Sequence, residues 1–443
     1  MGRTSKALVA AALFVAACTE PGGDSAPSPR VEAALEGRLD QLVDNYVESG
    51  ALPSLYVRVE RRTGEVVYEH GAWNPTFAPQ APVDGESWFR IWSMSKIVTI
   101  TAALDLAEAG VINLDDPVTH YIPEFADLRV AVAPDGDDLS DLSATSYQED
   151  AARGRLGALT CPLETEAVRS AMSVRDLLNH EAGFYYATTQ VSCLDQTLSY
   201  ADLPSAADAD AAIEIMSRLP LIQQPGSRYY YGTNTTVLGF VIERATGQSL
   251  AEVIADRITE PLGIDGLRYD LPAGASLLPR VTGRDGALRE ARPGDLDIFG
   301  GSVPHYSPGD RVQLGGEGMV STSAAYADFL HVLLGWGETG GVRILDRETV
   351  EELTAPQTQT ESDYGHNGYN LWVNSGLLPS GEYGVGGLWI GGGYEGTHFW
   401  IDPERGLVGL IMTQVHAPPA GAALVHDELR EAFYAAFYPG SGD

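Results

Sequence analysis

The feature that most constrains this chain is a serine followed three residues later by a lysine, Ser93 and Lys96, at the start of an apolar, alanine-rich stretch. The run from Ile97 to Leu106 predicts a helix that ends near Gly110, because glycine is common just after a helix C-terminus. Residues three apart lie on one helical face, so the Ser93 hydroxyl and the Lys96 amine can meet. A serine becomes a good nucleophile when a neighbour accepts its proton, and a neutral lysine can do this.

The scarcity of lysine makes Lys96 more informative. The sequence contains two lysines, Lys6 and Lys96, and Lys6 lies in an N-terminal segment that we expect to be removed. The remaining permanent cations are arginines, which stay protonated at ordinary pH and cannot act as bases. The alternative is that Ser93 caps a helix and that Lys96 is a solvated residue one turn later. The four-residue pattern by itself leaves both interpretations open.

The acidic balance of the chain excludes one class of function. Lysine and arginine total 28 against 61 aspartates and glutamates, which gives a formal net charge of −33 at pH 7. Nucleic-acid binding needs clustered cations, so we expect no nucleic-acid partner. Because the acidic residues are spread along the whole chain, we interpret them as a solvated surface suited to a saline habitat.

Residues 1–18 are typical of a bacterial lipoprotein signal peptide. A short basic region precedes an apolar run too short to span a bilayer, and small residues then precede Cys18, the expected lipidation site. A secretory signal without a lipid is the alternative. We therefore expect the protein on the periplasmic or outer-membrane face of a bacterial cell envelope, held at the membrane by a lipid anchor only.

The next segments predict a tether, a large domain and an insertion. Residues 19–30 are rich in Pro, Gly and Ser, which indicates a flexible tether. Within the domain expected at 31–437, residues 133–164 form a polar, irregular insertion that carries Cys161. Cys161 and Cys193 are candidates for a disulfide in an oxidising compartment, and two buried thiols are the alternative.

Strand patterns occur near both chain ends, and helix patterns occupy the middle. We therefore predict an α/β fold of the α+β type, with one antiparallel sheet built from both ends and flanked by helices. A mostly helical lobe is expected at about residues 105–350. The segments that alternate like strands are 55–60, 65–70, 369–373, 396–401 and 407–413.

Four motifs follow one another in an order that is more specific than any one of them. They are Phe89–Lys96, Gly110–Val118, Val174–Phe184 and Pro225–Tyr231. In this order they resemble the class C β-lactamase-like serine hydrolases, and most of all their carboxylesterase branch, the family VIII esterases. The resemblance covers roughly residues 31–437. It implies the β-lactamase and penicillin-binding-protein fold and chemistry through an acyl-enzyme, without a cofactor or metal.

The resemblance also implies the role of each catalytic residue. Ser93 is the expected nucleophile, Lys96 its proton partner, and Tyr231 the phenol that passes the proton to the leaving group. Tyr229 and Tyr230 are rivals of Tyr231, whose spacing to the following Leu-Gly pair matches the esterase branch better. The backbone N–H groups of Ser93 and Tyr394 are expected to form the oxyanion hole.

Two departures from the family pattern favour esters over β-lactams as substrates. Thr233 stands where relatives carry an asparagine, which weakens contact with a substrate amide. Gly391-Gly392-Gly393 stands where relatives carry Lys-Thr-Gly or His-Thr-Gly, so the side chains that hold a β-lactam carboxylate are missing. We expect the glycines to leave room for a bulky acyl or alcohol group, and a close backbone approach at a strand edge is the alternative interpretation. The expected substrate-pocket residues are Trp92, Thr233, Gly391, Gly392 and Gly393, with core packing as the alternative for Trp92.

The sequence therefore predicts a secreted serine hydrolase that acts on small carboxylic esters through an acyl-enzyme. Its partner is a small-molecule ester or amide, and its oligomeric state is left open. One alternative is a β-lactamase or D-amino-acid peptidase of the same fold. The other is a non-catalytic lipoprotein that binds a component of the cell envelope.

Overall fold

The computed structural model describes residues 29–439 apart from several gaps, and of residues 29–32 it describes the backbone alone. The predicted signal segment with Cys18, most of the predicted tether, and most of the predicted insertion with Cys161 lie outside the described residues. The gaps are residues 78–81, 134–162, 190, 293, 297, 301–302, 307–308, 310–311, 359–361 and 379–380.

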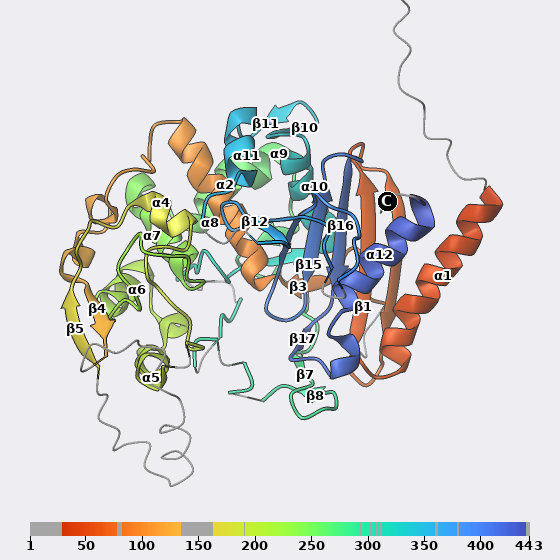
Figure 1. Ribbon diagram of the computed structural model, residues 1–443, viewed down its shortest axis with the longest axis horizontal. Coiled ribbons are helices and arrows are strands. Elements are labelled where there is room, and N and C mark those ends of the chain that lie inside the picture. Colours follow the sequence, from red (N-terminus) through yellow and green to blue (C-terminus); the bar gives the residue numbers. More distant parts are fainter. Residues whose placement is uncertain are drawn as a thin grey trace, which may run out of the picture.

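Both ends of the chain build one seven-stranded antiparallel sheet, as the sequence predicted (Figure 1). The strand order is β12-β13-β14-β15-β16-β1-β2. Next to the edge strand β2, β1 (Ser54–Arg61) pairs with β16 (Leu407–Met412), with Val57 opposite Ile411. The other strands are β2 (Val66–Trp73), β12 (Gly365–Asn367), β13 (Trp372–Asn374), β14 (Trp389–Gly392) and β15 (His398–Asp402).

The alternating side chains of the sheet serve two apolar cores, one on each face. In β15, Phe399 and Ile401 belong to the larger core shared with the helical lobe, whereas Trp400 belongs to the core under the terminal helices. Helices α1 (Pro29–Glu48) and α12 (Val425–Phe437) cover this second face, and α10 (Ser323–Leu334) packs on β15 and β16 from the other (Figure 1).

Two predicted boundaries differ from the observed ones. Helix α1 begins at Pro29, two residues before the predicted domain start. The predicted strand at 369–373 is wrong in position, because Asn370 adopts a φ of 51° and the chain turns before β13. Strands β12 and β14 have no counterpart among the expected strands, since their glycine-containing sequences do not alternate.

Helix α2 (Ser95–Glu108) lies between the sheet and the lobe, where it packs on α7 (Asn234–Thr246) and α8 (Leu250–Ile254). Its residues are buried on all sides through the first two turns, which explains why its sequence is apolar all round instead of amphipathic. This burial encloses Lys96, which lies in the first turn.

The lobe is mostly helical, as predicted, and its helices are short. Helix α4 (Val174–Leu178) begins with a capping box, in which the Ser173 hydroxyl accepts the Asp176 N–H at 3.1 Å and the Asp176 carboxylate accepts the Ser173 N–H at 2.8 Å. The other helices are α5 (Ser192–Ala201), α6 (Ala209–Met216), α9 (Glu260–Leu262) and α11 (Arg347–Thr354), with a π-helical turn at Ala255–Thr259.

Short strands complete the lobe and its borders. Strands β4 (Arg129–Val132) and β5 (Glu164–Ala167) pair on either side of the predicted insertion. Among the described helices, none has the length and apolar character that crossing a bilayer requires. The remaining strands are β3 (Trp88–Arg90), β6 (Leu267–Arg268), β7 (Val281–Thr282), β8 (Arg289–Glu290), β9 (Val320–Thr322), β10 (Glu338–Thr339), β11 (Val342–Arg343) and β17 (Val415–His416).

Candidate active site

Ser93 lies in a single 3₁₀ turn, Trp92–Met94, that leads directly into α2. Trp92 adopts a φ of 45°, a left-handed conformation that persists only where the surroundings hold it. The Trp92 indole N–H donates to the buried Glu395 carboxylate at 2.6 Å, and this bond fixes the residue before the nucleophile. The Lys96 Nζ lies 3.1 Å from the Ser93 Oγ, so the predicted contact of hydroxyl and amine is present.

Lys96 is fully buried, with 0% of its side chain exposed. Besides Ser93, its Nζ contacts the Tyr186 hydroxyl at 2.8 Å, the Gly316 carbonyl oxygen at 2.9 Å and a Glu317 carboxylate oxygen at 3.3 Å. The alternative of a solvated surface lysine is therefore wrong. A buried amine in contact with a serine hydroxyl has the geometry of a general base for that serine.

Tyr231 lies beside the amine, with the Lys96 Nζ 5.0 Å from the centroid of its ring. It is 38% exposed, so its ring reaches the molecular surface while touching the buried lysine. The rival residues make other contacts, Tyr229 with the His180 ring and Tyr230 with the Arg228 guanidinium. The described contacts thus favour Tyr231 over both rivals, and its role in proton transfer stays a prediction.

His180 holds Tyr231 in place. Its ring stacks on the Tyr231 ring at 4.8 Å, and its Nδ1 accepts the Gly232 N–H at 3.3 Å and the Asn234 amide at 3.1 Å. Burial, together with the nearby Lys96 charge, lowers the pKa of His180 to about 3, so the ring is neutral and free to accept these bonds. His180 therefore positions Tyr231 in two ways, because it stacks on the phenol ring and binds the backbone N–H of the next residue, Gly232.

Two further residues of the site, Tyr186 and Glu317, were not among the sequence predictions. The Tyr186 hydroxyl donates to the Glu317 carboxylate, and burial followed by the Glu317 charge raises the pKa of this tyrosine well above its usual value. Tyr186 is therefore a neutral phenol. The one local signal for Glu317 was an acidic residue within the glycine-rich turn 315–318.

The strand end that carries Gly393 approaches the nucleophile turn closely. A Cβ atom on Gly393 would lie 2.5 Å from the Ile91 carbonyl oxygen and 2.3 Å from the Thr397 hydroxyl, so only glycine fits. The next residue, Tyr394, contacts the Trp92 ring at a centroid distance of 5.3 Å. The predicted oxyanion residues, Ser93 and Tyr394, thus lie on two backbone segments that meet at Trp92.

The structure corrects our expectation that the glycine run leaves open space. A Cβ on Gly391 would lie 2.6 Å from the Phe399 ring, and the space beside Gly393 is filled as described above. These two glycines permit tight packing of the strand, and they do not widen a pocket. Gly392 is exposed, although a Cβ there would lie 2.9 Å from the Thr397 carbonyl oxygen.

Two other predicted pocket residues are part of the core. Trp92 has no exposed surface, so the alternative of core packing holds for it in this structure. Thr233 is 1% exposed and its hydroxyl donates to the Tyr185 carbonyl oxygen at 3.4 Å. Cys193 is disulfide-bonded, and its predicted partner Cys161 lies outside the described residues.

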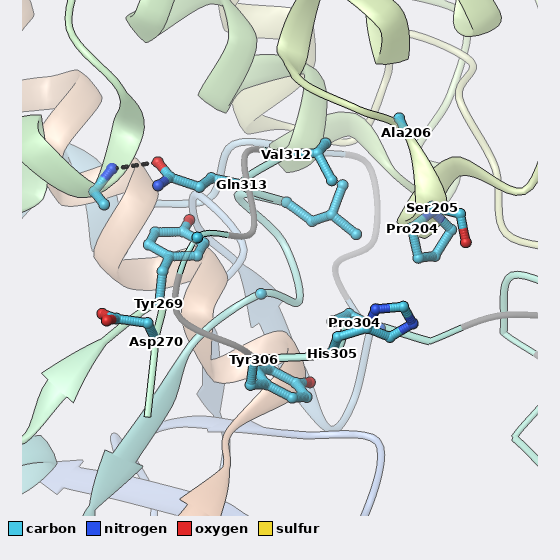
Figure 2. Close-up of a pocket in the computed structure, with 14 residues that line it drawn as sticks. Pro204, Ser205, Ala206, Tyr269, Asp270, Pro304, His305, Tyr306, Val312 and Gln313 are labelled. Carbon is cyan, nitrogen blue, oxygen red and sulfur yellow. Dashed lines mark hydrogen bonds between the residues drawn. The ribbon is translucent and has the colours of Figure 1, made fainter. Parts of the chain in front are cut away.

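A cavity of about 400 Å³ lies beside the 314–318 turn, since Leu314 and Gly318 are among the residues that line it (Figure 2). Figure 2 shows Tyr269 and Asp270 on one side of this cavity and Pro204 and Ser205 of the lobe on the other. Its wall also includes Tyr306, whose hydroxyl donates to the Glu317 carbonyl oxygen at 3.2 Å. The cavity is lined by neither the nucleophile nor the lysine, so it adjoins the site without containing it.

The fold and this arrangement of serine, buried lysine and phenol define a serine hydrolase. The chain belongs to the Beta-lactamase family, whose sequence model matches residues 39–432. This match confirms the resemblance and the fold class predicted from the motif order.

Individual relatives agree with the family assignment. Protein Rv1367c of Mycobacterium tuberculosis is 29% identical over 357 residues, which cover 76% of this chain and 79% of that protein. The lovastatin esterase of Penicillium rubens is 24% identical over 424 residues, which cover 89% of this chain and 96% of that enzyme. Among solved structures, EstCE1, described as a hydrolase with promiscuous acyltransferase activity, superposes with a TM-score of 0.69 at 19% identity and covers 92% of this chain and 100% of its own.

Proposed function

We propose that this serine hydrolase cleaves small carboxylic esters through an acyl-enzyme on Ser93. The observation that carries the proposal is the 3.1 Å contact between the Ser93 hydroxyl and the fully buried Lys96 amine. In the first step, Ser93 Oγ attacks the ester carbonyl while its proton moves to the neutral Lys96 amine. The negative charge that develops on the carbonyl oxygen is held by the N–H groups of Ser93 and Tyr394.

The second half of the reaction returns the proton and frees the acyl group. The Tyr231 phenol beside Lys96 gives a proton to the leaving alkoxide and regains one from the Lys96 ammonium, which restores the neutral amine. A water molecule then attacks the acyl-enzyme, and the same residues return a proton to Ser93 Oγ. An alcohol in place of water would give acyl transfer by the same steps. EstCE1, one of the similar structures, is described as a hydrolase with promiscuous acyltransferase activity.

Esters are favoured over β-lactams by the groups present near the nucleophile. The strand segment Gly391–Gly393 has no cationic side chain to hold a carboxylate, and Thr233 bonds to the protein backbone instead of facing a substrate. The lovastatin esterase among the relatives is named for ester cleavage. A β-lactamase or D-amino-acid peptidase remains the rival within the same fold.

Replacing Ser93 with alanine tests the proposal. We expect Ser93→Ala to lose at least about 10³-fold of the wild-type rate on p-nitrophenyl acetate and butyrate, because the nucleophile is removed. A fluorophosphonate probe should add its mass to the peptide that carries Ser93 in the wild type alone. Full esterase activity in Ser93→Ala would contradict the proposal.

Two further outcomes separate the rivals. Turnover of a cephalosporin as fast as of the short esters would favour the β-lactamase. A wild type that neither hydrolyses esters nor reacts with the probe would favour a non-catalytic binding protein.

The export of the chain and its lipid anchor at Cys18 are further proposals from the sequence, which fatty-acid labelling of wild type and Cys18→Ala would test.

A further inference from the structure

We infer that Glu317 is a positioning residue whose buried carboxylate holds the Lys96 amine and the Tyr186 phenol and stabilises the ammonium form of Lys96. The inference rests on the proposed role of Lys96 as the proton acceptor of Ser93. Its consequence is that the carboxylate sets the pH range in which Lys96 is neutral and the enzyme is active. It also stabilises the ammonium that forms when Ser93 gives up its proton.

The contacts of Glu317 divide between its two carboxylate oxygens. One oxygen accepts the Tyr186 O–H and lies 3.3 Å from the Lys96 Nζ, and the other accepts the Thr236 O–H at 2.6 Å. The Lys96 and Glu317 side chains are both 0% exposed, so no bulk water screens the charge pair. A buried carboxylate held by two hydroxyl donors is suited to carry a negative charge beside an amine.

The backbone around Glu317 fixes the carboxylate in this place. The Glu317 N–H donates to the Leu314 carbonyl oxygen at 3.1 Å, and the preceding Gly316 carbonyl oxygen accepts from Lys96 itself. A Cβ on Gly316 would lie 3.1 Å from the Lys96 Nζ, so glycine lets the turn pack directly against the amine. The turn therefore presents two acceptors to Lys96, one from its backbone and one from Glu317.

The other titratable groups that face the pair are one histidine and five tyrosines from four parts of the chain. His180 is neutral, as described above. Burial raises the pKa of four of the tyrosines, which are Tyr186, Tyr229, Tyr269 and Tyr306. Among the described residues, Glu317 is therefore the acidic side chain that contacts the Lys96 amine. The facing groups are His180, Tyr186, Tyr229, Tyr231, Tyr269 and Tyr306.

The first test is the pH dependence of kcat/KM for p-nitrophenyl acetate, compared between wild type and Glu317→Gln. Activity should rise with pH as Lys96 loses its proton. Removing the opposite charge favours the neutral amine, so we expect this rising limb to move to lower pH by roughly 1–3 units. The plateau at high pH should fall, because the ammonium formed in the transition state loses its counter-charge. A purely structural role would lower the rate at every pH and leave the limb in place, which would overturn the inference.

A second measurement reports on Lys96 without using activity. The full chain has two lysines, so ¹³C,¹⁵N-lysine labelling in a Lys6→Arg background leaves Lys96 as the one labelled residue. The Cε shift of Lys96 should titrate at lower pH in Glu317→Gln than in its parent. An unchanged midpoint would overturn the inference even if Ser93→Ala were inactive. Full activity in Ser93→Ala would instead remove the proposed function on which the inference depends.

A matched control and a second variant complete the test. Glu60 is also a buried glutamate, paired with His331 at 2.8 Å and with Arg58, and Glu60→Gln should leave the rising limb of the pH profile unmoved.

If Glu317→Gln does not fold, Glu317→Ala carries the test, since a methyl group fits in the vacated space. Formate should then restore the wild-type limb by replacing the carboxylate. Failure of Glu317→Ala to move the limb would overturn the inference.

Discussion

At the scale of single residues, the chemistry of the site depends on polar side chains that are buried away from bulk water. Lys96 is buried among four polar neighbours, and His180 stays neutral because burial opposes its protonation. Each of these states costs free energy, which the surrounding packing and hydrogen bonds must supply. The stability of the protein should therefore respond to pH through such groups.

His180 gives a pH prediction with a defined sign. Its pKa is about 3 in the folded chain, against 6.5 for a solvated histidine, so below pH 6.5 the unfolded chain binds a proton that the folded chain does not. Stability is therefore lost as pH falls from about 6.5 towards 3, and the loss from His180 reaches about 2 kcal/mol at pH 5. We expect the free energy of unfolding to fall between pH 7 and pH 5 by about 2 kcal/mol less in His180→Asn than in wild type.

Urea unfolding at the two pH values measures this difference. Asparagine suits the test because it tolerates the φ of 55° at this position and its side-chain oxygen can accept the Gly232 N–H. The variant is expected to be less stable than wild type at both pH values, so the comparison uses the difference between them. An equal loss in the two proteins would show that His180 does not carry this pH dependence.

At the scale of elements, the site is made where the 3₁₀ turn before α2 meets the end of β14. Neither element contains a complete set of catalytic groups. The turn supplies the nucleophile, α2 supplies Lys96, and the strand end brings the backbone of Gly393 and Tyr394 against Ile91. The distance between turn and strand therefore controls the geometry of the proposed oxyanion hole.

Gly393→Ala tests this element contact. The added Cβ would meet the Ile91 carbonyl oxygen at 2.5 Å, and the backbone there leads directly to Ser93. We expect kcat/KM for ester hydrolysis to fall by about 10²-fold, as for a displacement of roughly 1 Å at a catalytic site. Overpacking should also lower the stability by about 1–3 kcal/mol.

Gly421 provides the control for this substitution. A Cβ there would have no atom within 4 Å, so Gly421→Ala should retain both activity and stability. Rates and urea midpoints of the two variants are compared with wild type under the same conditions. Wild-type activity in Gly393→Ala would show that the strand end can shift without disturbing the nucleophile, against the proposed oxyanion geometry.

At the scale of the whole molecule, charge is the property that distinguishes this chain. A formal net charge of −33 produces repulsion between surface carboxylates that favours expansion of the chain. Ions screen this repulsion, with a Debye length of about 10 Å at 0.1 M salt. The many surface ion pairs with arginine, such as that between Arg175 and Asp115, offset only part of the excess.

The charge predicts a stabilising effect of salt. We expect the urea midpoint at pH 7 to rise between 0.05 M and 1 M NaCl, because screening relieves repulsion in the folded state. Near the sequence pI of about 4.5 the same increase in salt should have much less effect, which provides the control. A midpoint that does not rise with salt at pH 7 would remove the interpretation of the surface as an adaptation to saline conditions.

The sequence by itself determined the features that follow from local spacing and from motif order. The Ser93–Lys96 contact joins residues three apart, and alternation near both chain ends indicated the two-ended sheet. These patterns are readable because helix and strand periodicity place nearby residues on one face. The family followed from the order of such local motifs.

Only the tertiary structure decided which distant side chains meet Lys96 and what the glycine run does. Tyr186 and Glu317 lie 90 and 221 positions away from Lys96, and no local period encodes contacts of that span. Gly391 suggested open space in the sequence, but Phe399 from the paired strand fills that space. Burial and packing arise from the whole fold, so the electrostatic environment of the catalytic amine could be described only once the fold was known.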